Sequence, residues 1–164
     1  QLTGIFNRRV VFDALDEAME NANESQDREF TTIMFDIDFF KQVNDTYGHA
    51  GGDAVLISFA KLLESEITSP NIVGRIGGEE FLAILYLNQD QAAEFCKKLI
   101  IKINDNTVNF DGVDIKISSS GGVAFSSETN TSADLTNKAD ERLYEAKKSG
   151  RNRFKLIDIE LVGD

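Results

Sequence analysis

Apolar residues follow two different periods along this chain, and each period predicts one kind of secondary structure. In some stretches they recur every three or four positions, which is the spacing of one face of an α-helix. In others, β-branched and aromatic residues alternate or run together, which is typical of strands. The expected helices span residues 7–23, 53–67, 90–104 and 132–149, with a short helix and a glycine-rich loop within residues 39–53. The expected strands lie within residues 30–38, 71–76, 79–87, 108–126 and 153–159.

Turn-forming residues separate these elements. Gly77–Gly78 and Asp111–Gly112 each stand between two strands, and both dipeptides favour tight hairpin turns. Asp53 stands at the expected N-cap of a helix, and Gly150 follows the last one. Because strands and helices do not alternate regularly, the order favours an α/β sandwich, with a mostly antiparallel central sheet of about five strands flanked by helices. No repeat interrupts the pattern, so residues 1–164 are interpreted as one domain.

The composition is that of a globular protein with an excess of acidic residues. Hydrophobic residues make up 41% of the 164 positions and charged residues 27%, with a net charge of −11. That charge argues against a nucleic-acid binder, which would present a basic face. It still allows an anionic small ligand held by a metal or a local basic cluster. The apolar runs are too short to cross a bilayer, so we expect no membrane contact by this domain.

Two further features bear on location. The single cysteine, Cys96, lies in a helical pattern, which agrees with a buried thiol in a reducing cytosol. The chain begins at Gln1 without a basic-then-apolar leader. We therefore expect a cytoplasmic domain cut from a longer protein, and the sequence leaves open whether that parent protein is anchored in a membrane.

The first candidates for chemistry are carboxylates beside the expected core. Asp36 and Asp38 end a buried strand, and strand alternation puts both on one face. Glu79 follows the Gly77–Gly78 turn, so Asp36 and Glu79 converge if that hairpin lies beside the first strand. Carboxylates so placed repel each other unless a cation lies between them, and oxygen ligands open to substrate phosphates suit Mg²⁺. Solvated or helix-capping strand ends are the structural alternative.

Other polar residues also have both a chemical and a structural interpretation. Asn44 and Asp53 together suit guanine, through an amide donor and a carboxylate acceptor, yet both also suit a turn or a cap. Lys147 and Arg151 lie four residues apart and could hold one triphosphate. Lys147 also complements the dipole at the end of a helix. His49, the only histidine, is expected to pack in a loop.

Five segments of the chain resemble the GGDEF family of diguanylate cyclases. "GGEEF" at 77–81 is similar to the family signature in its common Glu variant, and "LTGIFNRR" at 2–9 resembles the opening motif. "FDIDFFKQVNDTYGHAGGDAVL" at 35–56 resembles the nucleotide-site segment. "SSGGVA" at 119–124 and "ADERLYEAKKSGRNR" at 139–153 resemble later segments. The likeness covers essentially the whole chain in order and spacing.

The resemblance implies a fold like that of class III nucleotidyl cyclases and polymerase palm domains. It implies a GTP-dependent nucleotidyltransferase that condenses two GTP molecules into the bacterial second messenger cyclic di-GMP, with release of two pyrophosphates. Each subunit of such an enzyme holds one GTP in a half-site, so catalysis needs a homodimer. The implied cofactor is Mg²⁺, with Mn²⁺ as a substitute.

The resemblance also assigns roles by position. Asp36, Glu79 and the Ile37 carbonyl are expected to ligate the metal. Asp36, Glu79 and Glu80 are the expected catalytic residues, although Glu80 receives no defined role. The expected substrate-binding residues are Asn44 and Asp53 for guanine, Lys147 and Arg151 for the terminal phosphates, Lys41 and the backbone around Phe39 and Phe40 near those phosphates, and Gly78 for close packing of the ribose.

Two positions depart from the family pattern. Many members carry an inhibitory Arg-x-x-Asp motif that binds the product shortly before the signature, whereas Thr68 and Asn71 stand there in this chain. We therefore expect no product inhibition through this primary site. The acidic residue that the family usually places before Leu-Thr-Gly would precede Gln1. The segment that couples to an upstream sensory or regulatory domain is therefore expected outside this chain.

Two alternative functions stay open at this point. One is a catalytically inactive module that binds GTP or cyclic di-GMP as a regulatory signal, although the expected residue types are all retained. The other is a relative that makes a mixed guanine–adenine cyclic dinucleotide, although Asp53 retains the guanine-selective type. A purely structural role would not need this set of polar residues.

Overall fold

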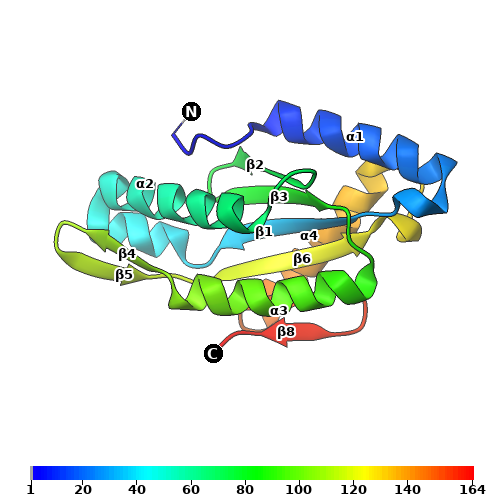
Figure 1. Ribbon diagram of the computed structural model, residues 1–164. Coiled ribbons are helices and arrows are strands. Elements are labelled where there is room, and N and C mark those ends of the chain that lie inside the picture. Colours follow the sequence, from blue (N-terminus) through cyan, green and yellow to red (C-terminus); the bar gives the residue numbers. More distant parts are fainter. Residues whose placement is uncertain (1) are drawn as a thin grey trace.

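The computed structural model describes residues 2–164, which form a central sheet with helices on both faces (Figure 1). The sheet has the strand order β2-β3-β1-β6-β7-β8, and β4 and β5 form a separate hairpin. The helices are α1 (Arg8–Glu24), α2 (Phe40–Glu66), α3 (Gln89–Asp105) and α4 (Ser132–Ser149). The strands are β1 (Thr31–Ile37), β2 (Ile72–Gly77), β3 (Glu80–Leu85), β4 (Thr107–Phe110), β5 (Val113–Lys116), β6 (Ser119–Phe125), β7 (Arg153–Lys155) and β8 (Glu160–Val162).

The predicted fold class is confirmed, with one difference in the number of strands. Within the sheet, β6 and β7 pair in parallel and the other neighbours are antiparallel. The sheet has six strands where about five were expected, because residues 153–159 do not form one edge strand. They hold β7, which lies beside β6 inside the sheet, and the turn that leads to β8 at the edge.

β1 is buried along its whole length because helices cover both faces of the sheet. Ile33 and Phe35 belong to the core that includes residues of α2 and α3, whereas Met34 belongs to the core formed with α1 and α4. The sequence of a strand that is buried on both faces is a continuous apolar run rather than an alternation of apolar and polar residues. Asp36 and Asp38 therefore stand at the end of a strand that is buried along its whole length.

α4 packs directly on the backbone of β6 at Gly122. A Cβ atom at this position would lie 1.8 Å from the carbonyl oxygen of Ala139 in α4. Any side chain larger than hydrogen would push the helix away from the sheet. The last turn of α4 can therefore reach the end of β1.

The glycine-rich segment is mostly helical, which corrects two expectations. α2 runs from Phe40 to Glu66, and Gly48 is the residue with a non-helical conformation, at φ 76°. Asp53 lies inside this helix, so the prediction that it is an N-cap is wrong. His49 is exposed on the same helix rather than packed in a loop. Gly48 separates a short helix from a longer one, as the sequence predicts, but the longer helix begins before Asp53.

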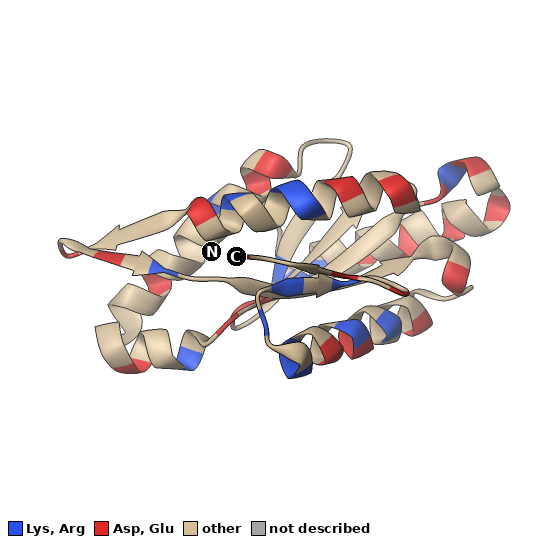
Figure 2. Cartoon of the chain, turned by 90° about the horizontal axis from the view of Figure 1, so that it is seen from below, with Lys and Arg blue, Asp and Glu red and all other residues tan. Residues whose placement is uncertain are grey.

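Two further expectations, a hairpin turn and a buried thiol, are confirmed. Asp111 and Gly112 both take positive φ, at 53° and 78°, as a two-residue hairpin turn requires. Cys96 is fully buried, and burial raises the pKa of its thiol. Across residues 2–164, the helices are all too short or too polar to cross a bilayer. Figure 2 shows acidic and basic residues interspersed along the helices.

Candidate active site

The predicted carboxylates meet where β1 ends. The antiparallel register of β1 and β3 sets Asp36 opposite Glu80, and the Ile37 N–H donates to the Glu79 carbonyl oxygen at 3.3 Å. The β2–β3 hairpin therefore lies beside β1, as the sequence analysis required. The structure brings Asp36, Glu79 and Glu80 together at one end of the sheet.

The turn of this hairpin differs by one residue from the expected one. β2 ends at Gly77 and β3 begins at Glu80, so the turn residues are Gly78 and Glu79. Neither glycine takes a positive φ, so the backbone conformation at these two positions does not require glycine. A Cβ atom on Gly78 would meet nothing within 4 Å. The turn thus leaves open space in front of the carboxylates.

Negative charge is concentrated at this point. Asp36 is 6% exposed and accepts a hydrogen bond from Lys147 Nζ at 2.7 Å. Burial raises the pKa of Asp36, and the charges of Glu79 and Asp38 raise it further, so that Lys147 offsets only part of the effect. Burial also raises the pKa of Glu80, together with repulsion from Asp36 and other nearby carboxylates. One lysine does not neutralise this group.

The residues present fit a divalent cation bound together with a nucleotide. A cation between Asp36 and Glu79 would relieve their repulsion, and both carboxylates and the Ile37 carbonyl offer hard oxygen ligands. Within residues 2–164 no three His, Cys, Asp or Glu side chains are grouped so as to hold a metal by themselves. Such a small protein ligand set leaves positions for phosphate oxygens, which is how Mg²⁺ is commonly bound in nucleotide sites.

Two cations from the C-terminal end of α4 lie beside the carboxylates. Lys147 is in the last turn of α4, and Arg151 follows Gly150, which caps the helix. The guanidinium carbon of Arg151 lies 4.7 Å from the centroid of the Phe39 ring. Lys147 thus lies against Asp36 and Arg151 against Phe39, the residue after Asp38. Lys41 is exposed and pairs with Asp45 at 3.1 Å.

Asn44, one of the two predicted guanine ligands, lies over Gly52. A Cβ atom on Gly52 would lie 1.8 Å from Asn44 Oδ1. Asp53, the other predicted ligand, follows Gly52 in the chain and is exposed. α2 thus carries both the amide and the carboxylate, one on each side of the kink at Gly48.

A cavity of about 560 Å³ lies between the start of α2 and the β4–β5 hairpin. Its lining includes Phe39, Tyr47 and Lys116, but none of the predicted metal or guanine ligands. Of the predicted substrate-binding residues it includes Phe39, and Asp38 and Asn152 also line it. The cavity thus adjoins the predicted phosphate side of the site and holds no predicted metal or guanine ligand.

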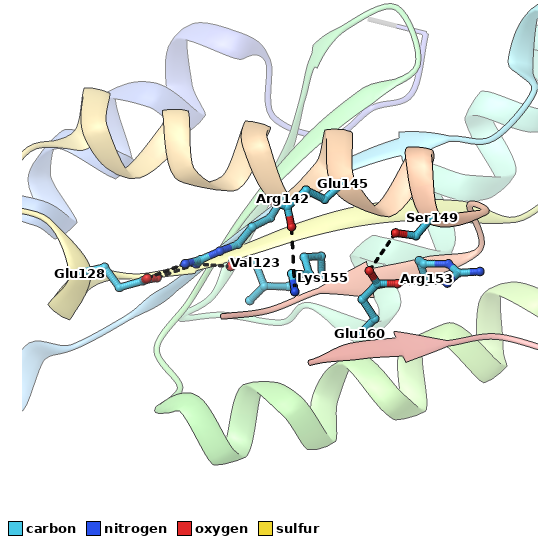
Figure 3. A network of polar contacts seen from close by, with 8 residues as sticks. All are labelled: Val123, Glu128, Arg142, Glu145, Ser149, Arg153, Lys155 and Glu160. Carbon is cyan, nitrogen blue, oxygen red and sulfur yellow. Dashed lines mark hydrogen bonds and ion pairs between the residues drawn. The ribbon is translucent and has the colours of Figure 1, made fainter. Parts of the chain in front are cut away.

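The sequence analysis missed the residues that hold α4 in place (Figure 3). Arg142 contacts both carboxylate oxygens of Glu128, at 2.6 and 2.7 Å, and donates to the Val123 carbonyl oxygen at 2.8 Å. Burial raises the pKa of Glu128, but hydrogen bonds from Arg142 and from the Phe125 N–H outweigh it and lower that pKa below its usual range. One signal was available, because Arg142 lies seven residues after the buried Leu135 and so on the inner side of α4.

Comparison with known proteins agrees with this arrangement. The profile of the family described as "Diguanylate cyclase, GGDEF domain" matches residues 1–153. Diguanylate cyclase DgcS of Shewanella oneidensis is 37% identical over 160 residues, which cover 98% of this chain and 53% of that protein. Diguanylate cyclase A of Treponema denticola is 35% identical over 159 residues, which cover 94% of this chain and 43% of that protein. The chain thus spans about half the length of these relatives.

A solved structure shows the same fold. The GGDEF domain of DgcB from Caulobacter crescentus, crystallised in complex with c-di-GMP, superposes with a TM-score of 0.90 at 28% identity. The match covers 97% of this chain and 92% of that one. Sequence, fold and the arrangement of carboxylates and cations lead to one assignment: the chain belongs to the GGDEF family of diguanylate cyclases.

Proposed function

We propose that this chain is the catalytic domain of a diguanylate cyclase, which condenses two GTP molecules into cyclic di-GMP and releases two pyrophosphates. The observation that carries the proposal is the meeting of Asp36 and Glu79 at the end of β1, with Lys147 2.7 Å from Asp36. The names of the curated relatives and the c-di-GMP bound to the DgcB domain support it. Because those relatives are longer, we also propose that the domain works within a larger, regulated protein.

The proposed residue roles follow from chemistry and position. Asp36, Glu79 and the Ile37 carbonyl would hold Mg²⁺, or Mn²⁺ in its place. When bound, such an ion neutralises triphosphate charge and lowers the pKa of a coordinated hydroxyl. Glu80 belongs to the same carboxylate group, and Gly78 leaves room for the ribose.

The remaining contacts select and orient the substrate. Asn44 and Asp53 would bind the guanine edge through complementary donors and acceptors. Lys147 and Arg151 would bind the terminal phosphates, and the backbone at Phe39 and Phe40 would lie beside them with Lys41. These groups act by positioning the substrate and by stabilising developing charge rather than by covalent chemistry.

Two such sites are needed for one product. Each chain offers one set of guanine and phosphate ligands and so positions one GTP. The 3′-hydroxyl of each GTP attacks the α-phosphate of the other, a new phosphodiester bond forms, and the bond to the leaving pyrophosphate breaks. Lys147 and Arg151 stabilise the charge on that pyrophosphate. The proposal therefore requires a homodimer with the two sites face to face.

Product formation at graded protein concentration tests this proposal. Incubation with GTP and Mg²⁺, with chromatography and mass analysis of the products, should show cyclic di-GMP at a rate that rises faster than linearly with protein. Mn²⁺ should replace Mg²⁺ in the same assay. Tight binding of GTP or cyclic di-GMP without turnover at any concentration would instead identify a regulatory module that has lost catalysis.

A further inference from the structure

Asp38 is a buried carboxylate that the proposed reaction does not use. It follows β1 directly and is 3% exposed. Its Oδ1 accepts a hydrogen bond from Ser120 Oγ at 2.7 Å, and its Oδ2 accepts one from Ser118 Oγ at 2.6 Å. Oδ2 also accepts a third hydrogen bond, from the backbone N–H of Asn152 at 2.9 Å. Both oxygens are thus engaged by the protein itself, and Asp38 joins the end of β1 to the turn that follows α4.

That turn has an unfavourable backbone conformation. Gly150, Arg151 and Asn152 all take positive φ, at 133°, 63° and 51°. Residues with a Cβ atom rarely adopt this region, and two in succession need stabilising contacts from their surroundings. On one side Arg153 Nε donates to the Arg151 carbonyl oxygen at 2.9 Å. Figure 3 shows Arg153 and Ser149 meeting at Glu160 of β8.

On the other side, the Asp38 bond to Asn152 fixes the turn against β1. This bond determines where Arg151 stands, because Arg151 immediately precedes Asn152. The Arg151 guanidinium lies over the ring of Phe39, which is the residue after Asp38 and itself takes a positive φ of 56°. Asp38 therefore connects two segments. Its main chain leads directly into residues 39–41, and its side chain holds the 150–152 turn. These are the two segments proposed to bind the phosphates.

We infer that Asp38 is a positioning residue for the triphosphate. By holding the Asn152 N–H, it keeps the strained turn in place and sets the distance between Arg151 and residues 39–41. It acts through Arg151 and does not itself contact the substrate. This inference rests on the proposed function, since it assumes that Arg151 binds phosphate.

Equilibrium binding tests the inference without requiring turnover. We would measure the affinity of a non-hydrolysable GTP analogue and of GMP, which lacks the terminal phosphates, for the wild type, Asp38→Ala, Arg151→Ala and the double variant. Asp38→Ala should weaken analogue binding about tenfold, the loss expected for a charge-assisted hydrogen bond, and leave GMP binding unchanged. The double variant should bind the analogue no more weakly than Arg151→Ala alone, because both changes remove the same contact.

Two results would overturn the inference. In one, the losses of Asp38→Ala and Arg151→Ala multiply in the double variant, so the residues act independently. In the other, Asp38→Ala weakens GMP and the analogue equally, which is the result of a general structural defect. Asp114→Ala, which changes an exposed carboxylate of the β4–β5 hairpin, serves as the matched control and should bind both ligands as the wild type does.

A milder variant keeps the test available if Asp38→Ala does not fold. Ser118→Ala removes the hydroxyl that orients Oδ2 but leaves the carboxylate in place. It should weaken analogue binding less than Asp38→Ala, about threefold, because the carboxylate and its bond to the Asn152 N–H remain, with GMP unaffected. Unchanged analogue binding would contradict the inference. A wild type that binds no guanine nucleotide at all would refute the proposed function, which is a separate outcome.

Discussion

Asp36 is the residue on which the proposed site depends most directly, since it is buried beside Glu79 and Asp38 and bonded to Lys147. Replacing it by Asn keeps its shape but removes the charge that would hold a cation. We expect Asp36→Asn to fold and to lose cyclic di-GMP synthesis by about 100-fold or more, the scale of losing one preorganised electrostatic contact. Turnover at saturating GTP and Mg²⁺ measures this.

The exposed Asp158 provides a control of the same chemistry, and Asp158→Asn should retain full turnover. Retention of turnover by Asp36→Asn would remove Asp36 from the metal-binding set. Glu79→Gln should resemble Asp36→Asn because both carboxylates serve the same proposed ion.

Asp53 is the residue proposed to select guanine. Its carboxylate is exposed on α2, where it would accept hydrogen bonds from the guanine ring N–H and amino group. Asp53→Ser should reduce the preference for GTP over ATP about tenfold, as expected for the loss of such a hydrogen bond. Competition binding with the two nucleotides measures the preference. An unchanged preference would contradict the guanine assignment.

Residues such as Asp38 show what the sequence could not supply. Asp36, Glu79, Lys147 and Arg151 were found because their types and spacing match a known pattern. The partners of Asp38 lie 80 to 114 positions away in the chain, so its role appears only once the sheet has formed. Local periodicity carries no information about such long-range hydrogen bonds.

At the scale of elements, predictions that rest on local periodicity are correct, whereas those that depend on the packing of distant segments are not. α1, α3 and α4 were predicted within a residue or two because their apolar faces have a clear period. The short helix before Gly48 was predicted, but residues 49–52 were expected in a loop because glycines favour loops, whereas they belong to the second helix. β7 was expected at an edge because strand order depends on packing of distant segments rather than on local pattern.

The Arg142–Glu128 contact holds the middle of α4 to the segment that follows β6 and should contribute strongly to stability. Both side chains are largely buried, at 12% and 14% exposure, so removing one leaves the other as an uncompensated charge. We expect Glu128→Ala to cost about 3 kcal/mol in the free energy of unfolding. Glu145→Ala, which removes the exposed partner of Lys155 on the same helix, should cost less than about 1 kcal/mol.

This contact also predicts a pH dependence. The folded-state pKa of Glu128 lies below its ordinary value of 4.5, so its contribution is fully present above that pH. The contribution is lost as the pH falls through the lower folded-state value, because the unfolded chain binds the proton first. Denaturant unfolding should therefore show a wild-type advantage over Glu128→Ala that is constant near neutrality and narrows below about pH 4.5. A constant difference down to pH 3 would argue against an ionised pair.

The turn before β2, which holds Thr68 and Asn71, predicts that the product does not inhibit the enzyme by binding there. The Thr68 carbonyl oxygen accepts a hydrogen bond from the Asn71 N–H, and Asn71 Oδ1 accepts one from the Tyr86 N–H at 2.8 Å. Neither side chain offers the charged pair that would grip a cyclic dinucleotide. Added cyclic di-GMP should not slow the wild type through this turn, whereas Thr68→Arg with Asn71→Asp should introduce inhibition. Wild-type inhibition that Asn71→Ala abolishes would contradict this.

At the scale of the whole molecule, net charge and assembly oppose each other. A homodimer would bring together two chains that each carry a net charge of −11, so long-range repulsion should weaken association at low salt. Raising the salt from about 10 mM to about 150 mM shortens the Debye length from about 30 Å to about 8 Å. The protein concentration that gives half-maximal specific activity at saturating GTP should therefore fall severalfold.

Sedimentation at the same salt concentrations would separate this effect from changes in substrate binding. Dimerisation that weakens as salt is added would show that local ion pairs between the chains outweigh their net repulsion.

The contact of α4 with Gly122 has a further consequence for how this fold changes over time. At that point the backbone of α4 lies against the backbone of β6, and a Cβ atom on Gly122 would lie 1.8 Å from the Ala139 carbonyl oxygen. The two backbones therefore set the spacing between helix and sheet. Elsewhere in the core, exchanges between side chains of similar volume can alter stability without moving Lys147 relative to Asp36. Lineages can therefore diverge widely around a chemical centre whose dimensions stay the same, and the DgcB domain, at 28% identity, retains the same architecture.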